Sequence, residues 1–384
     1  MGQLIQSRFT VLDSAQLGAW ARARVSEQIE ERRKAQAFSQ ALTEQGLVPV
    51  VMRHHLEELL GTESTSAAGA AVSLLNSLPL VATFRPADGM PGLGTVLDVL
   101  TAELIEAVKN SQADALSNAS AIRESCFAPM SGEELMVPYI SIWRELQPYS
   151  WAQAEHRRAA HAVSASQLFS LKKMKLKTLL AGRVRQGNDL VKQLAAMQLA
   201  MQRDVAAYGD KRISDPASVS QWFFQLVRNK GYSLPTTIEA FVRQALEMQH
   251  LSLEELNPED TIADILSMGM FRSRIKLAAE NAHLPIASAY RVDMEMIPSW
   301  LIESALSRHR QRKDERRGSE PVDAHLATLA PYAAFTFVDR RTAEAFRQAL
   351  VKQSIPIGLI RNVLKSGPYT DAVRRIVELK CSSS

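Results

Sequence analysis

Four acidic residues, two near each end of the chain, have the types and positions that best support chemistry. Asp13 closes the segment FTVLD at residues 9–13, and Asp339 closes AAFTFVD at 333–339. Glu58 and Asp323 lie in HHLEELL and VDAHLATLA, which have helical apolar spacing. Carboxylates in one crevice repel each other unless a hard divalent cation neutralises them, and an all-oxygen ligand set selects Mg²⁺ or Mn²⁺ over zinc. We therefore expect a Mg²⁺ or Mn²⁺ site.

The elements expected around these acids alternate between strands and helices at both ends of the chain. Near the start, strands are expected at 9–15, 47–52 and 78–84, separated by a long charged helix and by a helix at 54–61. Near the end, the expected order is helix 298–317, a helix around 322–330, strand 333–339, helix 340–353 and strand 354–360. Neither end can close a sheet alone, so one parallel sheet built from both ends is predicted.

This arrangement predicts where the acids lie. In an open parallel sheet the functional crevice is found at the carboxyl ends of the strands. Asp13 and Asp339 are expected there, Asp323 opens the helix before the last of these strands, and Glu58 lies on the helix after the second strand. The four carboxylates are therefore predicted to converge, although they are more than three hundred residues apart in sequence. Glu320 lies one helical turn before Asp323 if that helix extends so far back, and could replace it as a metal ligand.

Each acid also has an ordinary structural interpretation. An Asp after a strand is frequently a helix N-cap, which fits Asp13, Asp323 and Asp339 taken singly. Glu58 stands beside another glutamate, and one of the two must point outward. Only the combination, in this order and on these elements, favours a site.

Between the two ends the pattern is helical. Residues 91–297 have long 3.6-residue periodicities and almost no strand candidates, after a breaker cluster of Pro and Gly near 86–92. The expected organisation is an N-terminal half-domain at 1–90, a helical insertion domain at 91–297 and a C-terminal half-domain at 298–384. The expected fold class is α/β plus all-α: a discontinuous parallel sheet with flanking helices, interrupted by a large helical domain and predominantly helical overall.

Basic residues are clustered rather than evenly spread. The formal net charge is +4 and the sequence pI is about 9.0, with basic runs at 171–185 and 307–318. The second run immediately precedes Asp323, and such residues hold phosphate backbones. Its predicted nucleic-acid contacts are Arg308, Arg310, Arg312, Lys313, Arg316 and Arg317. The alternative is a solvated helix face, partly neutralised by Asp314 and Glu315.

Several classes of protein are excluded or disfavoured. There is no apolar signal segment or long apolar run, so a cytoplasmic protein without a membrane partner is expected. Two cysteines are too few for a disulfide scaffold, HHLEE is not the HExxH zinc spacing, and no phosphate-binding GxxxxGK[ST] motif occurs. The aromatic run at 222–224 favours a core position, because a base-stacking platform needs exposed rings beside positive charge.

Both ends of the chain resemble halves of the PIN-domain nuclease pattern. VLDSAQLGAW resembles the opening strand with its first catalytic Asp, here Asp13, and HLEELL resembles the helix that carries the second acid, here Glu58. DAHLATLAPYAAFTFVDRRTAEAFRQA is similar to the closing segment, which would supply Asp323 and Asp339. The family commonly has Thr or Ser two residues before the last Asp, where this chain has Phe337.

The resemblance implies a PIN-like domain with a large helical insertion that cleaves nucleic acid, RNA more often than DNA. The implied catalytic and metal-binding residues are Asp13, Glu58, Asp323 and Asp339, which would hold ions that lower the pKa of a coordinated water. We expect an endoribonuclease in a toxin-like or defence-like role, with an inhibitory or regulatory protein partner. The alternative is a catalytically inactive PIN-like scaffold or nucleic-acid-binding adaptor that acts through its helical domain.

Overall fold

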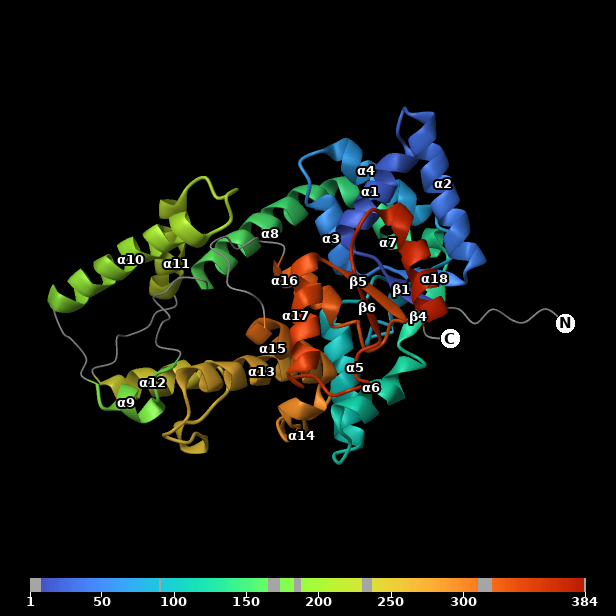
Figure 1. The fold of residues 1–384 in the computed structure, drawn as a ribbon. Helices are drawn as coiled ribbons and strands as arrows, with labels where there is room; N and C mark the ends of the chain where they lie inside the picture. Colours follow the sequence, from blue (N-terminus) through green and yellow to red (C-terminus); the bar gives the residue numbers. More distant parts are fainter. Residues whose placement is uncertain are drawn as a thin grey trace. The chain divides into compact units, whose positions relative to one another are not determined.

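A six-stranded sheet built from both ends of the chain organises the first of two structural units (Figure 1). The computed structural model describes residues 8–89, 91–164, 173–182, 188–229, 237–309 and 320–382. Neighbouring strands follow the order β4-β3-β2-β1-β5-β6. The strands are β1 (Arg8–Val11), β2 (Leu47–Val50), β3 (Val81–Phe84), β4 (Phe127–Met130), β5 (Phe335–Val338) and β6 (Asn362–Lys365).

The central strand β1 joins the two ends of the chain. It pairs in parallel with β2 on one side and with β5 on the other, where Val11 lies opposite Thr336. Each of these strands is fully or half buried and consists mainly of apolar and β-branched residues, as expected for a sheet covered on both faces. An α/β fold with helices around one sheet drawn from both ends is therefore confirmed.

Two details of the predicted sheet are wrong. The sheet is mixed rather than parallel, because β4 pairs antiparallel with β3 at the edge. The segment FAPM contains Pro129, which an edge strand tolerates, and its four residues are too few to show a clear alternation. The last strand is β6 rather than 354–360, because Pro356 and Gly358, whose φ is +85°, turn the chain there.

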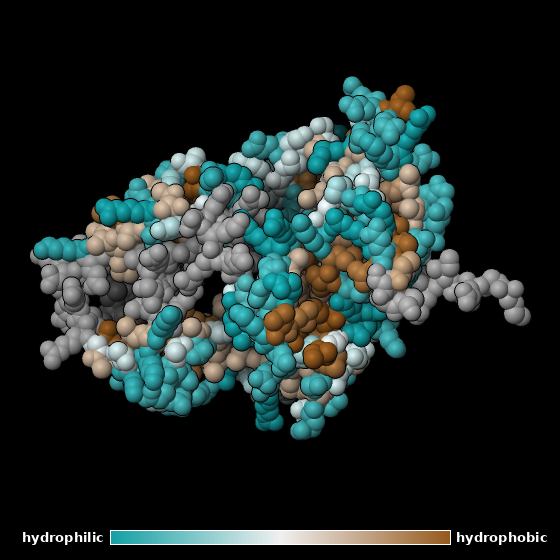
Figure 2. All heavy atoms as spheres, in the orientation of Figure 1, coloured by the Kyte–Doolittle hydropathy of each residue, from teal (hydrophilic) through white to brown (hydrophobic). Residues whose placement is uncertain are grey.

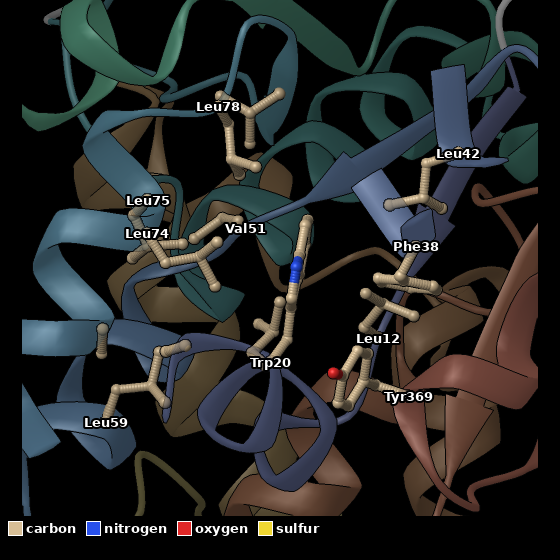
Figure 3. Close-up of a cluster of buried hydrophobic side chains, with 14 of the residues drawn as sticks. Leu12, Trp20, Phe38, Leu42, Val51, Leu59, Leu74, Leu75, Leu78 and Tyr369 are labelled. Atoms are coloured by element: carbon tan, nitrogen blue, oxygen red, sulfur yellow. The ribbon is translucent and has the colours of Figure 1, made fainter. Parts of the chain in front are cut away.

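One face of the sheet is covered by a core centred on Trp20 (Figure 3). The indole is fully buried, lies edge-on to Phe38 at 4.9 Å between ring centroids, and donates from Nε1 to the Ala35 carbonyl at 3.3 Å. Phe38 in turn lies edge-on to Tyr369 at 5.2 Å. The helices of this face are α1 (Ser14–Arg24), α2 (Ile29–Glu44), α3 (Arg53–Leu60), α4 (Thr65–Asn76), α7 (Gly132–Ile140) and α18 (Ala372–Ser382).

The opposite face is covered by a second core in which Phe84 lies edge-on to Phe127 and to Tyr332, at 5.9 and 5.8 Å. Its helices are α5 (Val96–Lys109), α6 (Ala115–Arg123), α15 (Pro298–His309), α16 (Glu320–Ala327) and α17 (Arg340–Val351). Leu350 and Val351 at the end of α17 and Ile357 after it are exposed apolar side chains, and Figure 2 shows apolar side chains on the surface of the molecule.

A buried carboxyl group on α5 ties three parts of this second face together. Glu103 is fully buried and accepts hydrogen bonds from the Ser299 backbone N–H at 3.0 Å, the Ser299 hydroxyl at 2.5 Å and the Tyr332 hydroxyl at 2.6 Å. Burial raises the pKa of Glu103 to about 7, although these donors act in the opposite direction. Helix α5 is thus fixed to the start of α15 and to the segment before β5.

The second unit is helical in the part that the structure describes. It comprises Glu155–Leu277 and Arg312–Glu320, whereas unit 1 comprises Met1–Ala154, Ala278–Gln311 and Pro321–Ser384. Small apolar clusters hold unit 2 together, one around Leu246 and one around Met201. The remaining helices of the chain are α8 (Trp143–Ser164), α9 (Leu176–Leu180), α10 (Asn188–Tyr208), α11 (Pro216–Asn229), α12 (Ile238–Glu247), α13 (Ile262–Asn281), α14 (Ile286–Ala289) and the 3₁₀ turns η2 (Leu253–Glu255), η3 (Met294–Met296) and η4 (Tyr369–Asp371).

The limits of unit 2 differ from the expected helical domain at 91–297. Helices α5, α6 and α7 and strand β4 belong to unit 1, because their apolar faces pack in the two cores that cover the sheet. Helical periodicity alone does not show which core a helix joins. In the described part of the chain, no helix is both long enough and apolar enough to cross a membrane.

Candidate functional site

Asp13 and Asp339 follow the carboxyl ends of two neighbouring parallel strands, β1 and β5. Each residue is the N-cap of the helix that comes next. Asp13 accepts a hydrogen bond from the Ala15 backbone N–H at 2.7 Å, and Asp339 accepts one from the Thr342 backbone N–H at 2.6 Å. Both bonds go to Oδ1. The N-cap interpretation is therefore correct for both residues.

The strand order reverses between these two residues. From β1 the chain enters α1, which packs on the face of Trp20, and continues to β2 on one side of β1. From β5 it enters α17, which packs on the opposite face, and continues to β6 on the other side. Two chain segments that leave neighbouring strands toward opposite faces open a crevice at the strand ends. Asp13 and Asp339 follow the two strands at which such a crevice is expected.

Two buried hydroxyl groups lie next to these residues in the chain or in the sheet. Ser14 follows Asp13, and Ser366 donates its backbone N–H to the Val338 carbonyl at 2.6 Å, beside Asp339. Neither hydroxyl oxygen has a hydrogen-bond partner among the described residues. Buried polar groups normally have a hydrogen-bond partner, so the carboxyl ends of β1 and β5 contain polar atoms to which a ligand could bind.

His55 links the carboxyl ends of β1 and β2. It is fully buried, accepts a hydrogen bond from the Met52 backbone N–H at Nδ1 (3.0 Å), and lies 2.9 Å from the Leu12 carbonyl through Nε2. This arrangement requires the neutral ring with the proton on Nε2. Burial lowers the pKa of His55 to about 4, which keeps the ring neutral at ordinary pH. His55 thereby fixes the backbone of the residue just before Asp13.

The other two predicted acids lie on helices that approach each other. Glu58 is on α3, four residues after His54 and so on the same face, and Asp323 is on α16, two residues before His325. The rings of His54 and His325 meet edge-on, with 5.1 Å between centroids. Asp323 lies inside α16 and does not open it, contrary to prediction, because the helix begins at Glu320.

The remaining predicted positions are described only in part. Helix α16 does extend back to Glu320, but the surroundings of that side chain lie outside the described residues. Arg308 lies near the end of α15, where its Nε donates to the Ser304 carbonyl at 3.3 Å. Five predicted nucleic-acid contacts lie outside the described residues: Arg310, Arg312, Lys313, Arg316 and Arg317. In the other basic run, Lys175 and Lys177 both pair with Glu259.

The hydroxyl residue nearest to Asp339 in the strand is Thr336. It is fully buried within β5, and its hydroxyl has no partner among the described residues. Phe337, which stands closer to Asp339, points into the core of Trp20. Phe337 therefore belongs to the core of Trp20, and Thr336 is buried in the same strand.

Asp13 and Asp339 thus follow two neighbouring strands, and buried hydroxyl groups lie next to them in the chain or in the sheet. In the described part of the chain, no group of three or more His, Cys, Asp and Glu side chains is close enough to hold a metal ion. Sequence reasoning missed His55, which it treated as an unconvincing ligand. Its signal was a histidine in the first turn of a helix that follows a buried strand.

No protein-family model, no curated protein and no solved structure matches this chain.

Proposed function

We propose that this chain is a Mg²⁺- or Mn²⁺-dependent endonuclease that hydrolyses phosphodiester bonds in RNA. The observation that carries the proposal is that Asp13 and Asp339 follow the carboxyl ends of β1 and β5, the two strands between which the strand order reverses. Asp323 and Glu58 complete the proposed site from α16 and α3, and Glu320 is the reserve ligand. The proposed setting is a cytoplasmic toxin-like or defence-like role under a regulatory protein partner.

The distribution of charge supports a division of work between the units. By sequence, unit 2 contains 22 Lys and Arg against 15 Asp and Glu, a formal charge of +7. Unit 1 contains 23 Lys and Arg against 26 Asp and Glu, a formal charge of −3. The whole basic excess therefore belongs to the helical unit, which suits a phosphate backbone, and Asp13, Glu58, Asp323 and Asp339 belong to the other unit.

The residues of the crevice fit a hard cation. Carboxylate and hydroxyl oxygens are the ligands that Mg²⁺ and Mn²⁺ prefer, and the hydroxyls of Ser14 and Ser366 are buried without a described partner beside the two aspartates. When bound, such an ion supplies an acidified water and offsets phosphate charge. The chain itself contributes position: the caps on α1 and α17 hold one oxygen of Asp13 and Asp339, and His55 fixes the backbone before Asp13.

The test is cleavage of labelled single-stranded RNA and DNA by purified protein with Mn²⁺, with EDTA as a blank. Asp13→Asn and Asp339→Asn keep an N-cap side chain but remove its charge, because Asn caps as well as Asp. Asp114→Asn is the matched control, since Asp114 caps α6 through the Ser117 N–H at 2.8 Å and lies away from the crevice. We expect the first two to lose cleavage and the control to keep it. Cleavage that survives both substitutions would refute the site.

The charge division also supports a second candidate, a nucleic-acid-binding adaptor without catalysis. Salt-sensitive binding through the +7 unit needs no carboxylate in the crevice. The same assay separates the two: an adaptor binds RNA with and without metal and never cuts it.

A further inference from the structure

Unit 2 contains a surface cavity of about 260 Å³ between α8, the loop before α11 and α11 itself. This volume is just below the roughly 300 Å³ at which pockets for whole drug-sized ligands begin, so it suits a single ring system. Its lining combines aromatic, charged and hydroxyl groups, chiefly His156, Arg158, Arg212, Asp215, Ser218 and Trp222.

The aromatic part of the cavity is Trp222, whose side chain is 37% exposed although Phe224, two residues later, is buried. Its indole lies nearly parallel to the ring of His156, with 6.1 Å between centroids and 15° between planes. The sequence favoured a core position for all three aromatic residues at 222–224. The structure assigns Phe224 to the core and leaves the indole of Trp222 accessible at the cavity.

The charged part of the cavity is organised before any ligand arrives. Arg212 is held by two hydrogen bonds to Asp210, from Nε at 2.9 Å and from Nη2 at 2.7 Å, while its side chain stays 58% exposed. The carboxylate of Asp215 is hydrogen-bonded at the start of α11, where it accepts from the Ser218 N–H at 3.1 Å and from the Ser218 hydroxyl at 2.5 Å. These bonds lower the pKa of Asp215. The lining contains two arginines, Arg158 and Arg212, and two acids, Glu155 and Asp215, so the cavity offers guanidinium groups beside the indole without an excess of positive charge.

An accessible indole next to a fixed arginine, on a unit of charge +7, has the two features of a platform for unpaired bases: a π face and a cation for the adjoining phosphate. We infer that this cavity binds a nucleobase of single-stranded nucleic acid by stacking on Trp222. The choice of ligand rests on the proposed function, but binding here needs no catalysis in unit 1.

The experiment measures fluorescence anisotropy of labelled single-stranded and duplex RNA dodecamers, with EDTA present and Asp339→Asn in every protein, so that nothing is cut. Stacking on one aromatic ring is worth about 1 to 3 kcal/mol, so Trp222→Ala should weaken single-strand binding by about 5- to 150-fold. Trp222→Phe keeps a π face and should lose less than Trp222→Leu, which keeps only apolar volume. Trp151→Ala is the matched control, because Trp151 is 36% exposed and lies in unit 1.

Several results would overturn the inference: no binding by the parent protein, equal losses in the Trp222 and Trp151 variants, or equal binding by the Phe and Leu variants. If Trp222→Ala does not fold, the comparison of Phe with Leu still decides. AMP added as a competitor distinguishes the sources of the base. Displacement by micromolar AMP that depends on Trp222 shows that a free nucleotide suffices, and displacement only by a strand shows that neighbouring phosphates are needed. Both the Asp339→Asn background and EDTA remove cleavage, so failure here leaves the nuclease proposal standing.

Discussion

The buried carboxyl of Glu103 should make the stability of unit 1 fall as the pH rises. Its pKa is about 7 in the folded chain and 4.5 as its ordinary value. Between these values the folded state holds a proton that the unfolded state has released, so the free energy of unfolding decreases with increasing pH. A difference of 2.5 pKa units, at 1.36 kcal/mol each, amounts to about 3 kcal/mol.

The informative variant is Glu103→Gln, which remains neutral at every pH. Glutamine can still accept from the Ser299 N–H, and the hydroxyls of Ser299 and Tyr332 can turn to accept from its amide. The substitution can change the free energy of unfolding at low pH by any amount. Between pH 4 and pH 8, however, the free energy of unfolding of the variant should rise by about 3 kcal/mol relative to that of the parent protein, because the variant has no carboxyl group to ionise. This double difference, variant minus parent at pH 8 less the same difference at pH 4, does not depend on how much the substitution destabilises the protein at low pH.

The assay is urea unfolding followed by tryptophan fluorescence at several pH values. Trp20, Trp143, Trp151 and Trp300 belong to unit 1, so Trp222→Phe in all proteins confines the signal to that unit. Glu106→Gln is the control, since Glu106 lies on the same helix but is partly exposed. A double difference that stays flat, or that favours the parent protein at high pH, would show that the three donors hold Glu103 as a carboxylate and would refute the reasoning.

Two further predictions concern the backbone around the strands. The folded-state pKa of His55 is lowered to about 4, so the contribution of this ring to the free energy of unfolding should fall by about 3 kcal/mol as the pH falls from 6.5 to 4, a loss that Glu103 offsets in the parent protein and that appears as the difference between parent and variant. His55→Gln, which can still donate to the Leu12 carbonyl, should lack this loss in thermal unfolding, and an equal loss in both proteins would contradict the buried neutral ring. Gly94→Ala would place its Cβ 2.1 Å from the Phe84 carbonyl oxygen and should destabilise by about 3 kcal/mol in urea. In Gly89→Ala the new Cβ meets open space at a φ of +70°, so this substitution should lower the free energy of unfolding by only about 1 kcal/mol. Equal losses in the two variants would contradict the close packing of Gly94 against Phe84.

The strands with continuous apolar runs could be predicted from the sequence. Strands β4 and β6, which lack such runs, could not. The runs around β1, β2 and β5 are buried on both faces and can be recognised from their composition alone. The edge strands β4 and β6 are partly exposed, and their pairing depends on neighbours that are distant in sequence. A local pattern therefore does not reveal them.

The candidate site divides in the same way. The positions of Asp13 and Asp339 after β1 and β5 could be predicted, because an acid at the end of a buried strand is a local signal. The link from His55 to the Leu12 carbonyl spans 43 residues, and the cavity at Trp222 depends on which side of α11 faces the apolar cluster around Met201. Both are products of packing, which residue spacing does not encode.

The pairing of β1 with β5 also orders events during synthesis. Val11 meets Thr336 only after more than three hundred further residues have been added, which at 5 to 20 residues per second takes roughly 15 to 65 s. Until then β1 has an open edge, and a chain that stops before β5 has neither the crevice nor Asp339. If the proposed site cuts RNA, cleavage cannot begin before the segment that contains β5 and Asp339 has been synthesised.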